Sequence, residues 1–268
     1  MGQTIDLTLF WIAFWCYLGS FLLFTAYSAV GKKWAGSTAT VLFLAAFALH
    51  TAGVGARWWV TGHPPFSTMY EYALSMAWML GLSFILFMGR YRRMSLGIIV
   101  SPMILMVLVI ASLLPKEASR QLMPALQSYW FYIHVTLAAL SEGAFILAAG
   151  AGVMYLLKGK REGGPLPGRD FLEELVSRSI RIGYPLFTVG ALFAGAVWAQ
   201  RAWGAFWSWD PKETGSLVIW LFYTLLLHQD VRGRWRGRTL ALLSIAGLVI
   251  IILSFLGNLF LGGLHAYI

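Results

Sequence analysis

The chain has 268 residues, of which 59% are apolar and only 12% are charged, and its mean hydropathy is +0.72. An ordinary soluble domain carries about 25% charged residues. The composition therefore excludes a soluble globular protein and indicates a membrane protein. The net charge of +9 does not indicate a nucleic-acid partner, because basic residues also collect where a polytopic protein meets anionic membrane lipid.

Long apolar runs follow one another along the whole chain. Each covers about 18 to 25 residues, enough to cross a hydrocarbon core about 30 Å thick as a helix. We count seven or eight of them, roughly at 8–30, 38–61, 69–89, 95–114, 129–157, 180–199, 214–230 and 239–262. The sequence thus predicts an all-α transmembrane bundle of about eight helices, forming a single integral-membrane domain over residues 1–268.

The first apolar run is expected to stay in the protein. It is too long for the core of a signal peptide, and no cleavage site of small residues follows it. Farther along, residues 170–182, DFLEELVSRSIRI, place apolar side chains at helical spacing among charges. This segment is interpreted either as a short amphipathic helix on the inner surface or as a solvated extension of the next span.

Lysine and arginine are divided unequally between the two sets of loops. Fifteen of the 20 basic residues fall on one side, and the other side holds only Arg57, Lys116, Arg120, Arg201 and Lys212. Because cytoplasmic loops carry an excess of basic residues, we expect both termini on the outer, periplasmic or lumenal, side. The stretch 203–214, WGAFWSWDPKET, is expected to face outward as well.

Aromatic residues crowd into this outer stretch. Tryptophan and tyrosine often form a belt at membrane interfaces, but a belt spreads around a bundle, whereas these residues share one loop. The pattern therefore favours a platform for a flat apolar ligand, with the belt as the alternative. The candidate cofactor-binding residues of this stretch are Trp203, Gly204, Trp207, Trp209 and Asp210, and Phe206 lies among them.

A helix start follows directly. Asp210 is placed as an N-cap, Pro211 occupies the first helical position, and Glu213 stands at the third. Capping would fix the end of the loop and so pre-organise the tryptophans, while Lys212 could pair with an anionic group. Thr68-Met-Tyr-Glu71 has the spacing of a capping box, which gives that pair a structural explanation.

Two histidines are expected near the same outer surface. His134 lies about one and a half turns inside the fifth run, and His265 follows the last run. Neutral imidazole is a good ligand for iron, and two histidines at one depth could hold a haem from both faces. A lone histidine is more often a hydrogen-bonded core residue, and that alternative stays open, as it does for His63 in the loop after the second run.

The remaining ionisable groups fall deeper in the membrane. His228 lies roughly 21 Å inward along its helix, so it either binds a second, deeper haem or forms hydrogen bonds near the cytoplasmic rim. His50 is expected to have a packing role in the second run. Glu142 lies well inside a predicted span and must be paired or protonated there; no role is assigned to it.

The single cysteine, Cys16, excludes an intramolecular disulfide and a Cys-x-x-Cys-His haem attachment motif on this chain.

WGAFWSWDPKET resembles the tryptophan-rich "WWD" signature of haem-handling membrane proteins. The most similar branch is the CcsA/ResC family of the system II cytochrome c biogenesis pathway, and every fixed position of its pattern W-G-x-x-W-x-W-D-P-K-E-T is met. Further similar segments are GHPPFSTMYE at 62–71, LQSYWFYIHV at 126–135 and GLHAY at 263–267. The resemblance covers most of the chain beyond the second run.

This resemblance implies a function. In the family, the histidines that correspond to His134 and His265 bind haem b on the outer side, and the one that corresponds to His228 belongs to an inner haem site. The family works with a CcsB/ResB partner to join haem to the Cys-x-x-Cys-His motif of apocytochrome c through thioether bonds. The chain would then be the haem-binding subunit of a cytochrome c synthase, in a bacterial plasma membrane or a thylakoid membrane.

Two other functions remain open at this point. The chain could pass haem on without attaching it, as an exporter or chaperone similar to the CcmC branch, although the DPKET continuation favours the first assignment. It could instead be an electron-transfer subunit with two b-type haems, which requires histidine pairs at two depths. No catalytic acid/base triad is recognised, and either Arg201 or Lys212 is expected to pair with a haem propionate.

Overall fold

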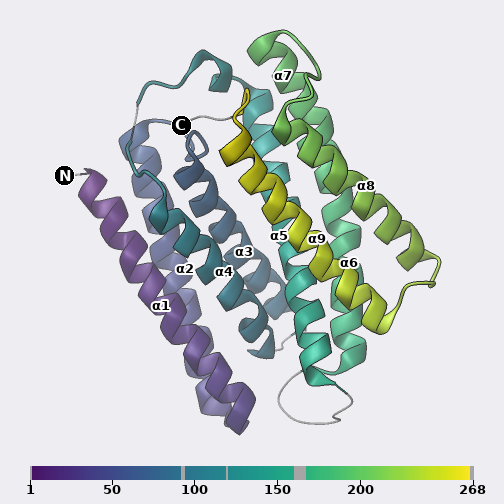
Figure 1. The fold of residues 1–268 in the computed structure, drawn as a ribbon. Helices are drawn as coiled ribbons and strands as arrows, with labels where there is room; N and C mark the ends of the chain where they lie inside the picture. The colour runs from purple at the N-terminus through teal and green to yellow at the C-terminus, as the bar shows by residue number, and fades with distance from the viewer. Residues whose placement is uncertain (1, 92–93, 119, 160–166, 266–268) are drawn as a thin grey trace. The chain divides into compact units, whose positions relative to one another are not determined.

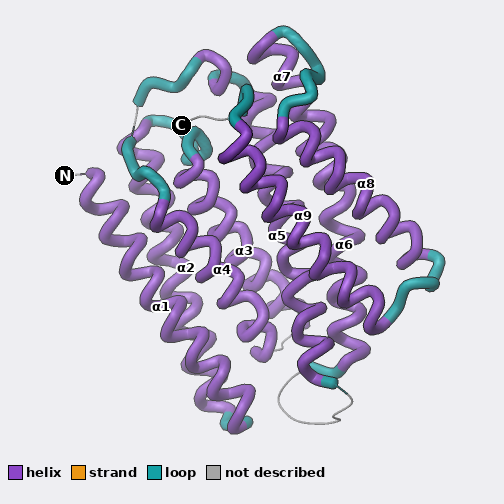
Figure 2. The backbone as a smooth tube through the Cα atoms, viewed as in Figure 1, coloured by secondary structure: helices purple, strands orange, loops and turns teal. Residues whose placement is uncertain are grey.

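The computed structural model describes residues 2–91, 94–118, 120–159 and 167–265, and these residues form helices joined by loops, without strands (Figures 1 and 2). The helices are α1 (Gly2–Val30), α2 (Lys33–Thr61), α3 (Met69–Tyr91), α4 (Gly97–Leu113), α5 (Tyr129–Lys158), α6 (Arg169–Phe187), α7 (Gly195–Trp203), α8 (Pro211–Val231) and α9 (Gly237–Leu261). Short 3-10 turns lie at Met94–Leu96 and Pro124–Leu126, and a π-helical segment, η3, covers Thr188–Ala194. The all-α prediction is confirmed.

Six helical stretches in the described part of the chain are long and apolar enough to cross a membrane. They are Ile5–Val30, Lys33–Thr61, Met69–Leu86, Tyr129–Lys158, Arg169–Trp203 and Gly237–Gly257, and the shorter α4 is also apolar. Together with α8 they make the eight predicted rods. The helix starts differ from the sequence estimate by several residues at α1 and α2, because hydropathy locates the apolar part of a helix and not its polar ends.

The chain folds into two compact units. The N-terminal unit contains α1 to α4, and the C-terminal unit contains residues 122–159 and the chain from 169 onward. In the N-terminal unit, α1 packs along α2 and α4, and α3 packs along α4. His50 is buried there, with Nε2 3.1 Å from the Leu74 carbonyl oxygen and Nδ1 3.5 Å from the Tyr17 hydroxyl. These contacts agree with the packing role predicted for His50.

Helix α5 is the centre of the C-terminal unit and packs against α6 and α9. Small residues allow the helices to approach closely, as is usual in membrane bundles. A Cβ atom at Gly152 would lie 2.4 Å from Ser244 Oγ and 2.8 Å from the Ala241 carbonyl oxygen. Glu142 is also buried on this helix.

Helix α6, η3 and α7 form one continuous rod from Arg169 to Trp203. Residues 170–182 are therefore the extension of a span, which decides between the two interpretations of that segment. Pro185 lies inside the rod, and because proline has no N–H, the regular hydrogen-bond ladder is interrupted there. The π-helical segment begins three residues later.

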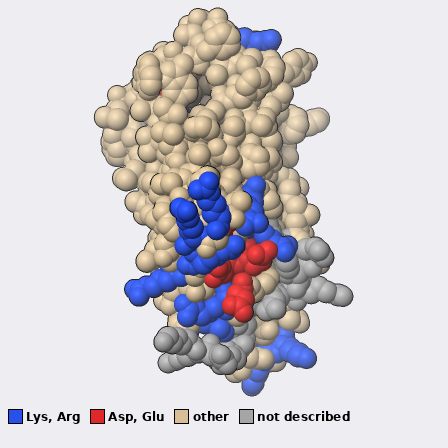
Figure 3. Space-filling view, turned by 90° about the vertical axis from the view of Figure 1, so that its right-hand side faces the viewer, with Lys and Arg blue, Asp and Glu red and all other residues tan. Residues whose placement is uncertain are grey.

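Charged side chains gather unevenly on the surface. On the face shown in Figure 3, most lysine and arginine side chains lie toward one end, around a few acidic residues, and a broad band beside them carries no charge. A band without charges is what a lipid-facing surface requires.

One acidic residue of the C-terminal unit is buried beside basic residues. Asp230 is fully buried and pairs with Arg181 at 3.0 Å and with Arg236 at 3.4 Å.

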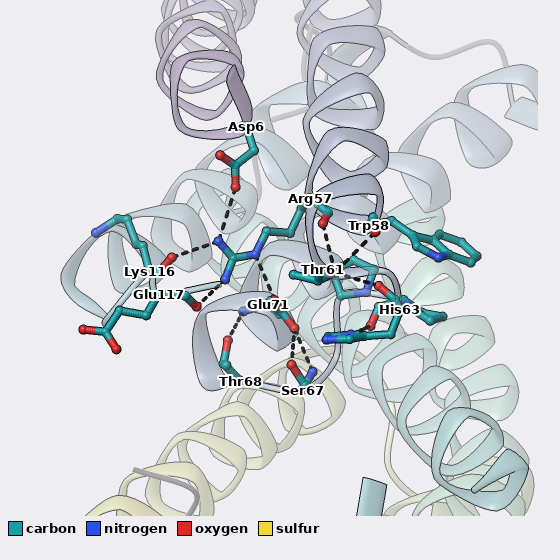
Figure 4. Close-up of polar contacts among 12 residues, drawn as sticks. Asp6, Arg57, Trp58, Thr61, His63, Ser67, Thr68, Glu71, Lys116 and Glu117 are labelled. Atoms are coloured by element: carbon teal, nitrogen blue, oxygen red, sulfur yellow. Dashed lines mark hydrogen bonds and ion pairs between the residues drawn. The ribbon is translucent and has the colours of Figure 1, made fainter. Parts of the chain in front are cut away.

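One of the basic residues counted on the outer side is buried. Arg57 lies in α2, inside the predicted run 38–61, and its side chain is completely buried (Figure 4). Its guanidinium donates to Asp6 Oδ2 at 3.3 Å and to Glu71 Oε1 at 2.9 Å. It also donates to the carbonyl oxygens of Lys116 and Glu117. The side chain thus ties α1, α2, α3 and the segment after α4 together within the N-terminal unit.

Candidate functional site

His134 is held in the second turn of α5 by the π-helical segment. Ser128 is the N-cap of this helix, and its hydroxyl accepts from the Trp130 amide. His134 Nδ1 lies 2.9 Å from the Gly190 carbonyl oxygen in η3. A Cβ atom at Gly195 would lie only 2.9 Å from the same Nδ1, so a residue without a side chain is needed behind the imidazole. Helical segments of the π type recur at functional sites.

Trp198 brings the two predicted haem ligands into one cluster. Its ring stacks on His134 with centroids 5.6 Å apart and planes at 10°, and it meets His265 edge-on at 5.4 Å. Trp198 is 1% exposed, and its Nε1 donates to the Ala125 carbonyl oxygen at 2.7 Å. Trp198 is not recognisable as a site residue from the sequence, because a single tryptophan near the end of a span is also typical of an interfacial belt.

Asp210 fixes the orientation of His265. Oδ1 of the carboxylate lies 2.8 Å from His265 Nδ1 and also accepts from the Lys212 amide, while Oδ2 accepts from the Leu264 amide at 2.6 Å. Asp210 is therefore confirmed as the N-cap of α8, and its carboxylate also holds His265 and the Leu264 amide. Gly263 has φ of +139°, and a Cβ atom there would lie 2.4 Å from Asp210 Oδ2, so the approach requires glycine.

Burial and charge set the protonation of this pair. Burial raises the pKa of Asp210, but His265 and the hydrogen bonds from Lys212 and Leu264 outweigh it, so the pKa lies below the ordinary 3.8. Burial lowers the pKa of His265 below 6.5, and the Asp210 carboxylate opposes this in part. At pH 7 the pair is thus a carboxylate and a neutral imidazole with the proton on Nδ1. Nε2 then carries the lone pair that a metal ion would use.

The aromatic residues of the predicted loop divide into two groups. Trp203 packs inward, with its ring 5.1 Å from His265 and 4.8 Å from Trp198. Trp207 and Trp209 contact each other edge-on at 5.7 Å, and Trp209 and Phe206 are exposed. Trp203 therefore contacts the two residues His265 and Trp198, and a role of Trp207 and Trp209 in ligand binding stays a prediction.

The other loop residues lie as follows. Gly204 ends α7 in the left-handed conformation that the turn requires. Lys212 places its amino group 5.8 Å from the centre of the Phe255 ring, and Arg201 is exposed. Pairing of either cation with a propionate stays a prediction.

His228 and His63 have surroundings of their own. His228 lies exposed in the last turn of α8, roughly 27 Å along the helix from Asp210 at 1.5 Å per residue. It is therefore separate from the outer pair, as predicted. His63 belongs to the N-terminal unit and is buried, with Nδ1 3.1 Å from the Pro64 carbonyl oxygen.

The residues of this cluster fit a haem. Both imidazoles engage Nδ1 with an oxygen atom, which is the usual arrangement behind a metal-bound histidine. Tryptophan rings supply apolar walls for a flat ligand. Trp203 Nε1 is buried and has no hydrogen-bond partner among the described residues, so it could donate to a propionate. We call the set His134, Trp198, Trp203, Asp210 and His265 the outer histidine cluster.

Comparison with known proteins gives a consistent result. The sequence model of the family described as "Cytochrome C assembly protein" matches residues 66–265. The chain is 34% identical to the cytochrome c biogenesis protein CcsA of Prochlorococcus marinus (strain MIT 9301), over 89% of this chain and 87% of that one. It is 36% identical to CcsA of Chlamydomonas reinhardtii over 79% of this chain, and spans 63% of the length of that protein.

A solved structure has a similar fold. The "Cytochrome c Heme Lyase CcmF" superposes with a TM-score of 0.73 over 96% of this chain and 47% of its own length, at 16% sequence identity. The likeness concerns the fold alone. With apolar helices of spanning length, the chain is an integral membrane protein. By the extent of its matches, it belongs to the cytochrome c assembly protein family, within the CcsA group.

Proposed function

We propose that the chain binds haem b at the outer histidine cluster and presents it for attachment to apocytochrome c. The observation that carries the proposal is the contact of His134 and His265 with the same buried ring, that of Trp198. Each imidazole also has Nδ1 engaged, by Gly190 or by Asp210. Two oriented imidazoles beside apolar walls are the ligand set of a six-coordinate haem.

The chain's own task in this reaction is positioning. Haem supplies the vinyl groups to which the two thiols of the apocytochrome add, so no nucleophile is needed from this chain. His134 and His265 orient the ligand, Trp198 and Trp203 exclude water beside it, and the Asp210 carboxylate keeps the His265 proton on Nδ1. Correct orientation of the reactants accounts for much of the rate in such reactions.

Haem is proposed to enter on the inner side near His228, with a membrane partner of the CcsB/ResB type. His228 is exposed in the last turn of α8, and this exposure supports a ligand that is shared with another chain. Attachment through thioether bonds, the partner and the choice of membrane all belong to this proposal. An electron-transfer subunit with two haems is less well supported, because His50 already uses both ring nitrogens in packing contacts.

The visible spectrum and pyridine haemochrome of the purified protein test this proposal. We expect a b-type, six-coordinate spectrum in the wild type, produced together with the partner. His134→Ala and His265→Ala should each abolish the six-coordinate signal of the outer site, and His228→Ala should preserve it. Haem that is unchanged in the first two variants would contradict the assignment. Thioether formation on a Cys-x-x-Cys-His apoprotein is measured separately from haem delivery. Delivery of haem without thioether bonds would indicate simple export and not attachment.

A further inference from the structure

Two helices in this chain begin with the same arrangement of a serine and a buried glutamate. At α3, Glu71 Oε2 accepts from the Ser67 amide at 2.9 Å and from the Ser67 hydroxyl at 2.6 Å. At α8, Glu213 Oε2 accepts from the Ser208 amide at 2.7 Å and from the Ser208 hydroxyl at 3.1 Å. Glu71 and Glu213 are 1% and 7% exposed. Each carboxylate therefore reaches back and fixes the loop that precedes its helix.

The second carboxylate oxygen distinguishes the two residues. Glu71 Oε1 accepts from the buried guanidinium of Arg57 at 2.9 Å (Figure 4). Glu213 Oε1 is buried and has no hydrogen-bond partner within the described residues. A buried carboxylate oxygen without a partner is unfavourable. Glu213 Oε1 forms no ion pair comparable to that of Glu71 Oε1, so the stabilising contacts of Glu213 are those of Oε2.

Glu213 Oε2 binds the chain on both sides of a strained residue. Besides the Ser208 amide, it accepts from the Asp210 amide at 3.4 Å. Trp209, between these two, has φ of +59° and is the only non-glycine residue with positive φ in the described part of the chain. A bulky side chain rarely adopts this conformation, and such residues concentrate at functional sites. The Glu213 carboxylate therefore holds the turn at Trp209 in place.

The turn at Trp209 determines where the Asp210 carboxylate points. Asp210 follows Trp209 directly, and its two oxygens bind His265 Nδ1 and the Leu264 amide. A continuous series of hydrogen bonds thus leads from Glu213 through the turn to Asp210 and on to His265. Every link lies within the C-terminal unit.

We propose that Glu213 is a positioning residue for the outer site, which sets the orientation of the His265 imidazole through Trp209 and Asp210. The inference rests on the proposed function only in taking His265 as an iron ligand. Its structural part, the control of His265 by Glu213, holds without haem. Glu71, which makes the same contacts to its own serine in the N-terminal unit, supplies the matched control.

The first experiment uses the haem-free, full-length protein in detergent. Glu213→Ala removes both acceptor oxygens, whereas Glu213→Gln keeps one. We expect amide hydrogen exchange over residues 208–210 and at Leu264 to rise about tenfold in Glu213→Ala, from the loss of a buried acceptor, with a smaller rise in Glu213→Gln. Diethyl pyrocarbonate should modify His265 faster in the alanine variant, while the rate at His228 stays constant. Unchanged exchange and unchanged His265 reactivity in Glu213→Ala would overturn the proposal.

The second experiment reads the haem-loaded protein by its spectrum and reduction potential. Glu213→Ala should shift the iron from six-coordinate low-spin toward high-spin and alter its potential, and Glu213→Gln should restore most of the wild-type signal. Glu71→Gln should lower the thermal stability and leave the spectrum unchanged. A wild-type spectrum in Glu213→Ala, where His265→Ala has lost its signal, would refute the positioning role. Haem signals unaffected by His134→Ala and His265→Ala would refute the proposed function instead, and the haem-free measurements would still decide the role of Glu213.

Discussion

Among single residues, Asp210 connects the largest number of features of the candidate site. Its carboxylate starts α8, orients His265 and binds the amide of Leu264. Of these three contacts, only the cap can be predicted from the sequence, because capping depends on neighbours in the sequence. The other two depend on residues more than 50 positions away.

Asp210→Asn should weaken haem binding about 10- to 100-fold, the usual effect of changing the partner of a metal-bound histidine. The amide can still cap the helix, but it lacks the charge that holds the proton on His265 Nδ1. Haem titration of the detergent-purified protein measures the change. Asp170→Asn, an exposed position in the first turn of α6, serves as the control. Equal affinity in both variants would contradict the role of Asp210.

The pH dependence of stability should also report on this pair. His265 has a pKa below 6.5 in the folded protein, so the unfolded chain binds a proton more readily and stability decreases as the pH falls below 6.5. The lowered pKa of Asp210 acts in the same direction at more acidic pH, below its ordinary 3.8. Thermal unfolding of the haem-free protein between pH 7.5 and 5 measures the first effect. In His265→Ala the slope should be smaller, and an unchanged slope would exclude His265 as its source.

At the scale of elements, the π-helical segment η3 places a carbonyl oxygen against His134. Gly190 makes this approach possible, because a Cβ atom there would lie 2.3 Å from Leu137 Cβ on α5. The hydrophobic pattern predicted the span but not its π segment, since the pattern reports which residues face the core and not the local helix type.

Gly190→Ala should separate η3 from α5 and lower the free energy of unfolding by about 1–3 kcal/mol, as overpacking usually does. Because the His134 contact moves with the segment, the haem spectrum should change as well. Gly55→Ala is a suitable control, since a Cβ atom at this position in α2 has nothing within 4 Å. Thermal unfolding and the visible spectrum of both variants test the expectation, and identical behaviour would rule it out.

A second element-level feature is the buried arginine of the N-terminal unit. Arg57→Ala leaves Asp6 and Glu71 buried without their cation, which should destabilise the protein by about 3–5 kcal/mol. Thermal unfolding in detergent measures this loss. Arg57→Lys keeps the charge but not the forked geometry that reaches four acceptors, so an intermediate loss is expected. Equal stability of wild type and Arg57→Ala would show that the network is not needed.

At the scale of the whole molecule, the distribution of basic residues predicts how the chain is inserted. Because cytoplasmic loops are rich in lysine and arginine, both termini and the loop at 203–210 should lie outside. Reporter fusions test this arrangement. Alkaline phosphatase should be active after Ile268 and inactive after Arg234, whereas green fluorescent protein should show the reverse. The opposite pattern would invert the orientation and place the outer histidine cluster on the cytoplasmic side.

Composition and local sequence patterns are enough to predict the class of the protein and several local features. Hydropathy indicated a bundle of about eight helices, and the Asp210-Pro-Lys-Glu213 motif located the start of α8. His134 and His265 were identified as candidates because imidazole chemistry and the resemblance agree. These features are readable because they depend on composition or on residues within a few positions of one another.

The folded structure was needed to show which residues far apart in the chain come into contact. It placed Trp198 against both histidines, the Gly190 carbonyl behind His134, and the Asp210 carboxylate behind His265. It also buried Arg57 among four acceptors from three other segments of the chain. These contacts join residues far apart in the chain, and they depend on how helices pack, which no local pattern of residues specifies.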